Sequence, residues 1–434
     1  MNAIEVVGGF ESTYQPAYDV DVAETTGHVR RWKQDLGLLR SCGVRRIRYP
    51  VRWHRIQPEV GRYDWGATDR TLGWLRGEGF RPIVDLLHHT SYPKWLEQGF
   101  ADRRFAAAYL RYLELFARRY PWVEEYTLFN EPFATLFLAG HQGVWPPYLH
   151  GVGGLVRLFY NVLPPLAEAS RMYRELLPDA RHVHVDTCER HSGGRGGEAY
   201  AALANDRRFF VLDLLLGRPL HPERPFVGEL LRAGGEELLG LEAGHIDVLG
   251  LDYYAHSEWR FVTGAGIAPS PTPAPLSALI SDYWDRYRLP CMLSETNIRG
   301  FSSDRASWLK YTLEQCELAV ARGVPLAGYC WFPFIDSCDW DSLLSRSDGS
   351  IDPVGVYWLD ERLERRPSSM SVSYALAAGG APSRALPAYR FQPPVSDWLE
   401  GFLPHMRHWD WRPPPMHELR CSVSSVSRGA DGRR

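Results

Sequence analysis

The sequence lacks several features that would assign it to large classes of protein. It has no apolar run long enough to span a bilayer, and its first residues, MNAIE, are not followed by the basic and apolar regions of an export signal. Charge is nearly balanced, with 49 Lys and Arg against 52 Asp and Glu, so no excess of one sign marks a surface for nucleic acid or an acidic membrane. We therefore expect a cytoplasmic protein that binds neither nucleic acid nor membrane.

Cysteine is scarce as well, and its seven residues follow no paired pattern. They stand at positions 42, 188, 291, 316, 330, 338 and 421, an odd number without a Cys-x-x-Cys pair. Neither a disulfide framework nor a zinc ribbon is indicated. Such cysteines are typical of a reducing compartment, which agrees with the expected cytoplasmic location.

Aromatic residues, in contrast, are abundant. The 16 Trp and 22 Tyr exceed what a core of this size requires. Flat rings pack well against the apolar faces of sugars. This composition favours a carbohydrate or a small glycoside as the substrate.

Short apolar segments alternate with longer segments of helical periodicity over the first 335 residues, a pattern typical of βα units around a parallel sheet. Eight buried strands are predicted, the number that closes a barrel, at 4–10, 46–49, 82–87, 125–129, 182–186, 246–253, 290–294 and 326–331. Helices are predicted at 28–41, 105–119, 155–177 and 305–322. The sequence thus predicts an α/β fold, a single (β/α)8 TIM barrel over residues 1–376.

Two composition shifts within the barrel and one after it indicate irregular segments. Four glycines in 193–197 and four prolines in 269–275 predict surface loops near the barrel mouth. From residue 377 to 434 Pro, Arg and Ser dominate, and the final stretch SSVSRGADGRR is predicted to be disordered. We interpret 377–434 as an extension of the barrel.

Two carboxylates stand where a barrel carries its reactive side chains, at the C-terminal ends of strands. Glu131 follows the fourth predicted strand and Glu295 ends the seventh, so the two should face each other across the mouth. Glycoside cleavage needs one carboxyl that holds a proton and one ionised carboxyl that attacks the anomeric carbon. Their separation is about 5–5.5 Å for retention and about 6.5–9.5 Å for inversion. The pair predicts a glycoside hydrolase.

Strings at the strand ends carry a family resemblance that spans nearly the whole barrel. They are, in order, RYPVRWHRIQP (48–58), LLHHTSYP (86–93), FNEP (129–132), LGLDYY (249–254), LSETN (293–297) and GYCWFPFIDSCDW (328–340). These strings resemble the motifs of family-1 glycoside hydrolases. The resemblance implies a retaining β-glycosidase of the β-glucosidase kind, without cofactor or metal, in which Glu131 is the general acid/base and Glu295 the nucleophile.

The same resemblance implies roles for residues close to this pair. Arg48 would support the nucleophile, Asn130 would bind the sugar 2-hydroxyl, and His89 would bind the 3-hydroxyl. Tyr254 would donate a hydrogen bond to Glu295.

The remaining sugar contacts are implied in the same way. Asp339 would grip the 4- and 6-hydroxyls with Trp340 beside it, and Trp331 would form the floor under the sugar ring. Strand one offers two candidates. Gln15 would be the family's glutamine, whereas Glu11 is nearer to the strand end.

Departures from the family pattern indicate a divergent branch or a neighbouring family of the same clan. Ser-Glu-Thr-Asn (294–297) stands where the family has Thr-Glu-Asn-Gly, and Thr90 follows His89 where the family has Trp. Asp339 is one methylene shorter than the family's glutamate.

Several alternatives stay open from the sequence. A transglycosylase would use the same pair, and a non-catalytic sugar-binding barrel in a glycan pathway would keep the fold for recognition. Glu189 also follows a strand and competes for a catalytic role. The histidines at 88, 89, 182 and 184 permit a metal site, although 182 and 184 begin the fifth strand, away from the mouth.

Overall fold

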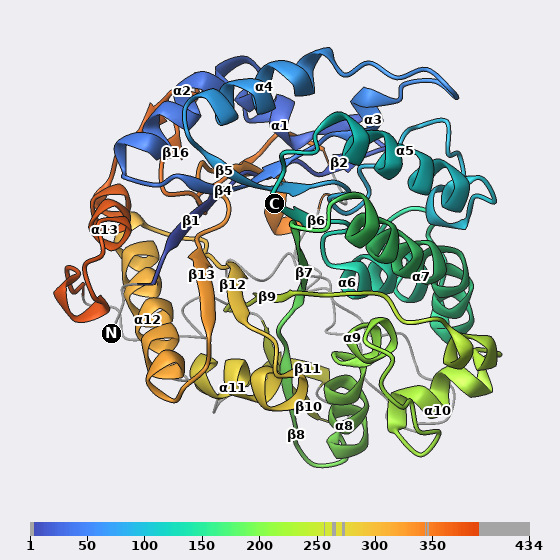
Figure 1. The fold of residues 1–434 in the computed structure, drawn as a ribbon. Helices are drawn as coiled ribbons and strands as arrows, with labels where there is room; N and C mark the ends of the chain where they lie inside the picture. Colours follow the sequence, from blue (N-terminus) through green and yellow to red (C-terminus); the bar gives the residue numbers. More distant parts are fainter. Residues whose placement is uncertain are drawn as a thin grey trace, which may run out of the picture.

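Eight parallel strands close a barrel in the order β1-β13-β12-β9-β7-β6-β5-β4 (Figure 1). The computed structural model describes residues 4–389, apart from 256, 263–265, 271–273, 343, 345 and 346. The barrel strands are β1 (Val6–Gly9), β4 (Arg46–Pro50), β5 (Arg81–Asp85), β6 (Glu125–Thr127), β7 (Arg181–Thr187), β9 (Val248–Asp252), β12 (Cys291–Glu295) and β13 (Leu326–Cys330). Each of them overlaps a predicted strand, so the predicted (β/α)8 barrel is confirmed.

Helices surround the barrel (Figure 1). The long ones are α2 (His28–Ser41), α4 (Gly66–Gly77), α5 (Phe105–Arg119), α7 (Gly151–Leu176), α11 (Leu276–Tyr287), α12 (Ser302–Ala321) and α13 (Ser369–Ala378). Their sequences explain this place, because apolar residues recur every three or four positions. In α5 the buried positions include 105, 109, 112, 113 and 116, and charged residues fill the other face. The four predicted helices are confirmed, α2 and α5 with the predicted bounds.

The alternation of side chains along each strand divides the apolar residues into two cores. The core inside the barrel consists of Val7, Ile83, Val183, Val185, Val248, Met292, Cys330 and Phe332. A larger core fills the layer between strands and helices. Gly9 at the end of β1 lets the Phe332 ring approach closely, since a Cβ at Gly9 would lie 2.5 Å from Phe332 Cδ2.

An ionic cluster closes the barrel at the amino ends of its strands. Nε and Nη2 of Arg46 donate to the two carboxylate oxygens of Glu125 at 2.6 and 2.7 Å. Arg181 Nη2 donates to the same carboxylate at 2.5 Å. This bidentate pairing joins β4, β6 and β7 at the end opposite the mouth.

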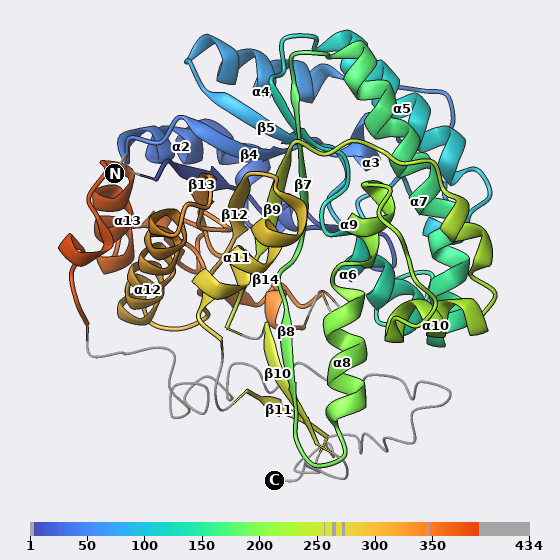
Figure 2. The same ribbon diagram turned by 60° about the horizontal axis from the view of Figure 1, so that its bottom comes forward.

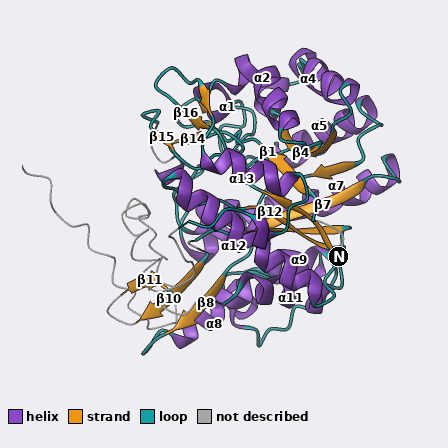
Figure 3. Ribbon diagram, turned by 90° about the vertical axis from the view of Figure 1, so that its left-hand side faces the viewer, coloured by secondary structure: helices purple, strands orange, loops and turns teal. Residues whose placement is uncertain are grey.

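After β7 the chain leaves the barrel at its carboxyl end and forms a separate lobe (Figures 2 and 3). The lobe contains β8 (Arg190–Gly193), α8 (Glu198–Arg207), β10 (Glu258–Val262) and β11 (Gly266–Pro269), whereas α9 (Phe210–Leu215) and α10 (Pro225–Arg232) lie near α7 (Figure 2). Its sheet has the order β11-β10-β8. The predicted loop at 193–197 is a turn between β8 and α8, with only Gly193 on the strand, and the described residues of 269–275 after Pro269, the last residue of β11, are also loop. Residues 271–273 lie outside the described part.

Short elements complete the fold around the mouth. They are the strand pairs β2 (Tyr14–Gln15) with β3 (Val20–Asp21), β14 (Ser337–Cys338) with β15 (Ile351–Asp352) and β16 (Trp358–Leu359) with β17 (Arg365–Arg366), and the helices α1 (Val22–Thr25), α3 (Trp53–Ile56) and α6 (Pro132–Leu136). Packing continues beyond the predicted boundary at residue 377, since Ser383 N donates to Glu317 at 2.7 Å. The rest of the predicted extension, 390–434, lies outside the described residues.

Two further findings bear on the composition. The six cysteines within the described residues are buried and free, and Cys421 lies outside them. No helix in the described ranges has the length and apolarity that crossing a bilayer requires.

Candidate active site

A cavity opens at the carboxyl ends of the barrel strands, and the space in it amounts to about 980 Å³ when the open solvent at its mouth is included. Six of the predicted site residues line it, namely Glu11, His89, Glu131, Tyr254, Glu295 and Trp340. Another part of its wall is apolar and consists of Val22, Phe133, Phe137, Leu138, Trp145 and Leu344. The cavity therefore combines a polar end rich in carboxylates with an apolar side.

Glu131 occupies a strained position between a strand and a helix. Its backbone is left-handed, with φ 48° and ψ 59°, a conformation that costs a non-glycine residue about 1–3 kcal/mol. The surrounding structure holds it there, because Glu131 N donates to Val185 O at 2.9 Å and Pro132 begins α6 directly after it. Asp186, near the end of β7, accepts a 2.9 Å hydrogen bond from Phe133 N and so anchors the first turn of α6.

Glu295 is held from both sides at the end of β12. Arg48 Nη1 donates to its Oε1 at 2.5 Å, and Tyr254 Oη donates to its Oε2 at 2.5 Å. The side chain is 1% exposed as part of a buried cluster that still borders the cavity. Two strong donors on an ionised carboxylate fix its orientation and stabilise its charge.

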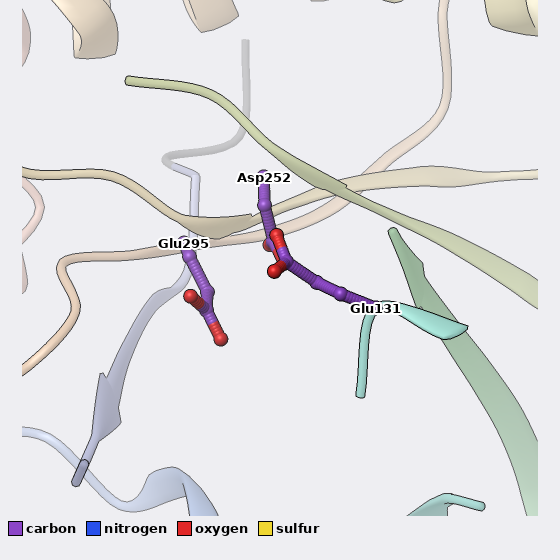
Figure 4. A group of neighbouring side chains, drawn as sticks. All are labelled: Glu131, Asp252 and Glu295. Carbon is purple, nitrogen blue, oxygen red and sulfur yellow. The ribbon is translucent and has the colours of Figure 1, made fainter. Parts of the chain in front are cut away.

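The two carboxylates converge on one point of the cavity (Figure 4). One oxygen of Glu131 and one of Glu295 lie within 4.8 Å of each other, and an oxygen of Asp252 lies within the same distance of both. Burial, followed by the charges of Asp252 and Glu295, raises the pKa of Glu131 well above its usual range. The geometry can thus hold one carboxyl protonated beside another that is ionised.

Behind this pair, Arg48 connects three elements of the barrel. Its Nη2 donates to Asn130 Oδ1 at 2.7 Å, and the guanidinium stacks over Phe332 with 5.3 Å to the ring centroid. Burial alone would lower the pKa of Arg48, but the charges of Glu295, Asp252 and Asp85 raise it. Arg48 is therefore a permanent cation of the site. Since it already contacts Glu295, a metal ion among the same carboxylates would meet a positive neighbour.

A buried ionic chain supports the strand-one side of the cavity. Glu11 Oε1 accepts from Thr13 N at 2.7 Å and lies 3.4 Å from His88 Nε2, and His88 Nδ1 lies 2.7 Å from Asp85 Oδ2. Burial opposes both charges, yet His88 lowers the pKa of Glu11 to about 2, while Asp85 and Glu11 raise that of His88 to about 10. Burial and the charge of His88 lower the pKa of His89, so His89 faces the cavity as a neutral ring.

Four of the predicted sugar contacts, Gln15, Asn130, Trp331 and Asp339, are not among the residues that line the cavity. Gln15 lies on β2 and is buried in the hairpin beside the mouth. Asp339 turns into its own loop, where its oxygens accept hydrogen bonds from Gly349 N at 3.0 Å and Ser350 N at 3.3 Å. Trp331 points into the layer under the helices, where its Nε1 donates to Val354 O at 2.9 Å. The reason is alternation along the strand, since the neighbouring Phe332 enters the barrel instead.

Sequence reasoning missed two acidic residues of the site. Asp252 ends β9 beside the pair, and Asp186 anchors the helix that follows Glu131. A signal for Asp252 was present, because it precedes Tyr254 by two positions and so points into the barrel with it. Asp186 had no comparable signal. Its contact with α6 depends on a helix that follows a different strand.

The comparisons with known proteins agree with this geometry. A model of glycosyl hydrolase family 1 matches residues 11–191. Beta-glucosidase A of Thermotoga maritima is 23% identical over 376 residues, covering 78% of this chain and 83% of that relative. Thermostable beta-glucosidase B of Thermobispora bispora is 28% identical over 361 residues, covering 72% and 73%.

Solved structures share the fold. The family 1 b-glucosidase from Thermotoga maritima superposes with a TM-score of 0.70 at 20% identity, covering 82% of this chain and 88% of that chain. The beta-glucosidase from the same organism in complex with noeuromycin gives a TM-score of 0.72 at 19% identity, covering 88% and 98%. At these identities the likeness shows the common barrel.

Proposed function

Because the chain is a glycoside hydrolase, and a divergent member of glycosyl hydrolase family 1 or a close relative of it, we propose that it cleaves β-glycosides with retention of configuration. Glu295 is the nucleophile and Glu131 the general acid/base of this reaction. The observation that carries the proposal is the approach of their carboxylate oxygens to within 4.8 Å. An approach this close supports the roughly 5–5.5 Å spacing of retaining enzymes over the roughly 6.5–9.5 Å spacing of inverting ones.

The proposed reaction has two steps. In the first, Glu295 attacks the anomeric carbon, the bond to the leaving oxygen breaks, and the proton of Glu131 moves to that oxygen. In the second, Glu131, now ionised, takes a proton from water, and the water oxygen displaces Glu295 from the sugar. Arg48 and Tyr254, at 2.5 Å from Glu295, orient the nucleophile before each turnover.

A panel of nitrophenyl glycosides of glucose, galactose, fucose and mannose tests the activity and identifies the sugar. With the best substrate, Glu295→Ala should lower turnover by roughly four to six orders of magnitude. Azide should restore it and yield a glycosyl azide of inverted configuration, because azide replaces the missing nucleophile. Azide on Glu131→Ala should instead give the retained azide, because it attacks the glycosyl-enzyme.

Glu258→Gln is the matched control for these variants. Glu258 is a buried carboxyl on β10 that does not line the cavity, and it accepts a 2.8 Å hydrogen bond from Tyr253 Oη. Its substitution should leave turnover of the folded enzyme near the wild-type value. Full activity in Glu295→Ala, or identical azide products from both alanine variants, would reject the assigned roles.

Transglycosylation remains a second candidate, because an acceptor alcohol can replace water in the second step. The cavity has an apolar wall with Phe133, Phe137 and Trp145. This wall favours transglycosylation because it lowers the amount of water in the cavity that competes with an acceptor. Product analysis with added alcohols separates the two reactions.

The free, buried cysteines support the cytoplasmic location that we expect from the sequence.

A further inference from the structure

Asp252 is a third carboxylate beside the catalytic pair, and the reaction described above gives it no role. It is the last residue of β9 and is fully buried, with none of its surface exposed. Figure 4 shows its carboxyl group close to those of Glu131 and Glu295, which come from different strands. It is not part of the cavity wall, so it reaches the substrate through its neighbours.

The two oxygens of Asp252 differ in their partners. Oδ1 accepts a 2.6 Å hydrogen bond from Ser294 Oγ. Oδ2 is buried, and no N–H or hydroxyl group in the part of the chain that the structure describes donates to it. A buried carboxylate oxygen without a donor costs free energy, so a neighbour that carries a proton is needed there. Glu131 is that neighbour, since the two carboxyl groups are within hydrogen-bond reach.

The charges around the pair also require a shared proton. The groups that face it are Glu295 on β12, Arg48 on β4, Asp186 on β7, Cys330 on β13, His89 after β5 and Tyr254 after β9. Arg48 is the permanent cation among them. Burial and the charge of Glu295 raise the pKa of Asp252, as burial and its neighbours raise that of Glu131. Two such carboxyls in contact lose their protons in separate steps.

We propose that Asp252 is a positioning residue for the acid/base: it accepts the proton-bearing hydrogen bond of Glu131 and keeps that proton in the cavity until a substrate binds. The inference rests on the proposed function. When the substrate binds, the proton leaves the Glu131–Asp252 contact for the departing oxygen as the bond between Glu295 and the anomeric carbon forms. Glu295 loses its charge as an ester while Glu131 gains one, so the total charge of the site stays constant.

Asp252 acts in the second step as well. Its charge lies beside the newly ionised Glu131 and makes Glu131 a stronger base toward the incoming water. As water gives its proton to Glu131 and its oxygen to the sugar, Glu295 is released and the shared proton is restored. One residue therefore supports both the acid and the base roles of Glu131.

Asp252→Asn tests the proposal, since it removes the charge and keeps an oxygen that accepts from Ser294. Glu131 should then ionise at lower pH, and the alkaline limb of kcat/KM should move down by about one pH unit or more. The probe is the phenyl glycoside of the preferred sugar, whose poor leaving group needs the proton. The 2,4-dinitrophenyl glycoside of that sugar leaves without protonation, so its limb should not move between wild type and variant.

Ser294→Ala provides a change of opposite sign. It removes the donor to Oδ1, which makes the Asp252 carboxylate less stable, so the pair should keep its proton to higher pH and the limb should move up. If thermal melting shows that Asp252→Asn does not fold, Ser294→Ala alone tests the role of Asp252. Glu258→Gln is the control, because burial raises the pKa of that carboxyl to about 7 although it lies outside the cavity wall. Its limb should coincide with the wild-type limb.

The proposed function and this inference fail in different ways. Activity retained by Glu131→Ala and Glu295→Ala would reject the function itself. If both are inactive while Asp252→Asn and Ser294→Ala keep the wild-type limb, only the role of Asp252 is overturned. A limb that moves in Glu258→Gln would overturn it too. So would a wild-type profile that changes with added Mg²⁺ or with a chelator, because the three carboxylates would then hold a cation in place of the proton.

Discussion

Strand β4 carries two arginines that lie at opposite ends of the barrel and have different partners. Arg46 and Arg48 are two positions apart, so they point the same way, and both are buried, at 2% and 1% exposure. Arg46 lies at the amino end of the barrel and forms a bidentate pair with Glu125. Arg48 lies at the carboxyl end and divides its donors between Glu295 and Asn130.

The difference lies in how many acids surround each cation. At the amino end, Arg46 and Arg181 share Glu125 and Arg46 also lies 3.5 Å from Glu5, so two cations meet two acids and the cluster stabilises the closed end. At the carboxyl end, Arg48 faces Glu295, Asp252 and Asp85 together, and Glu131 lies beside the first two. The unmatched negative charge there favours a held proton, which glycoside cleavage uses. The comparison teaches that a buried arginine stabilises the fold or supports chemistry according to its acidic neighbours.

The largest expected effect comes from exchanging each arginine for lysine. Arg48→Lys keeps the charge but loses the fork that contacts Glu295 and Asn130, so kcat/KM should fall by about 10³-fold, about 4 kcal/mol of transition-state stabilisation. Arg46→Lys should leave kcat/KM of the folded enzyme unchanged. Steady-state kinetics on both purified variants measures this, and equal losses would remove the functional distinction between the two ends.

Glu125→Gln should produce the next largest effect, on stability alone. It removes the carboxylate that pairs with the buried cation Arg46 and with the exposed Arg181, and Arg46 then keeps only Glu5 at 3.5 Å, so the free energy of unfolding should fall by about 3 kcal/mol. Glu114→Gln is the control, since Glu114 pairs with Arg118 at 2.9 Å on the surface and should cost less than about 1 kcal/mol. Urea unfolding compares the two variants, and similar losses would mean that the closed end contributes no more than a surface pair.

Titration of His88, at the carboxyl end of the barrel, should make the free energy of unfolding depend on pH. Although its burial acts against the charge, Asp85 and Glu11 raise the pKa of His88 from 6.5 to about 10. A raised folded-state pKa gives stability that is complete below about pH 6.5 and lost as the pH rises to about 10, at most about 5 kcal/mol for a shift of this size. Urea unfolding at several pH values should show this loss in the wild type and a smaller one in His88→Gln. Parallel curves for the two proteins would exclude His88 as its source.

The smallest predicted effect distinguishes two acceptors near strand one. Glu11 lines the cavity. Its Oε1 accepts hydrogen bonds from Ser12 N and Thr13 N and lies 3.4 Å from His88 Nε2, so Oε2 is the oxygen left for a sugar hydroxyl. Glu11→Gln should therefore raise KM about tenfold, the cost of about one hydrogen bond. Gln15→Met should change KM by less than about twofold. A larger change in KM for Gln15→Met would show that Gln15 contacts the sugar.

Side chains set by strand position alone could be predicted, and those set by loops could not. Glu131 and Glu295 follow directly from strand ends, because every parallel strand of a closed barrel delivers its carboxyl end to the same mouth. The surroundings of Asp339 could not be predicted because its loop folds back, so that its carboxylate accepts hydrogen bonds from the backbone of Gly349 and Ser350. The lobe with β8 and β10 was missed because its strands pair across 68 positions, as between His191 and Trp259, which local periodicity does not record.

The sequence by itself determined the barrel, the two carboxylates Glu131 and Glu295 at its mouth and the arginine behind them, because hydrophobic period and strand order are local properties that repeat around a closed sheet. Only the tertiary structure decided which acids meet. Asp252 lies 121 positions from Glu131 in the chain (252 − 131 = 121) and within 4.8 Å of it in the fold. Electrostatic coupling depends on that distance and on burial, and neither is encoded in any single segment.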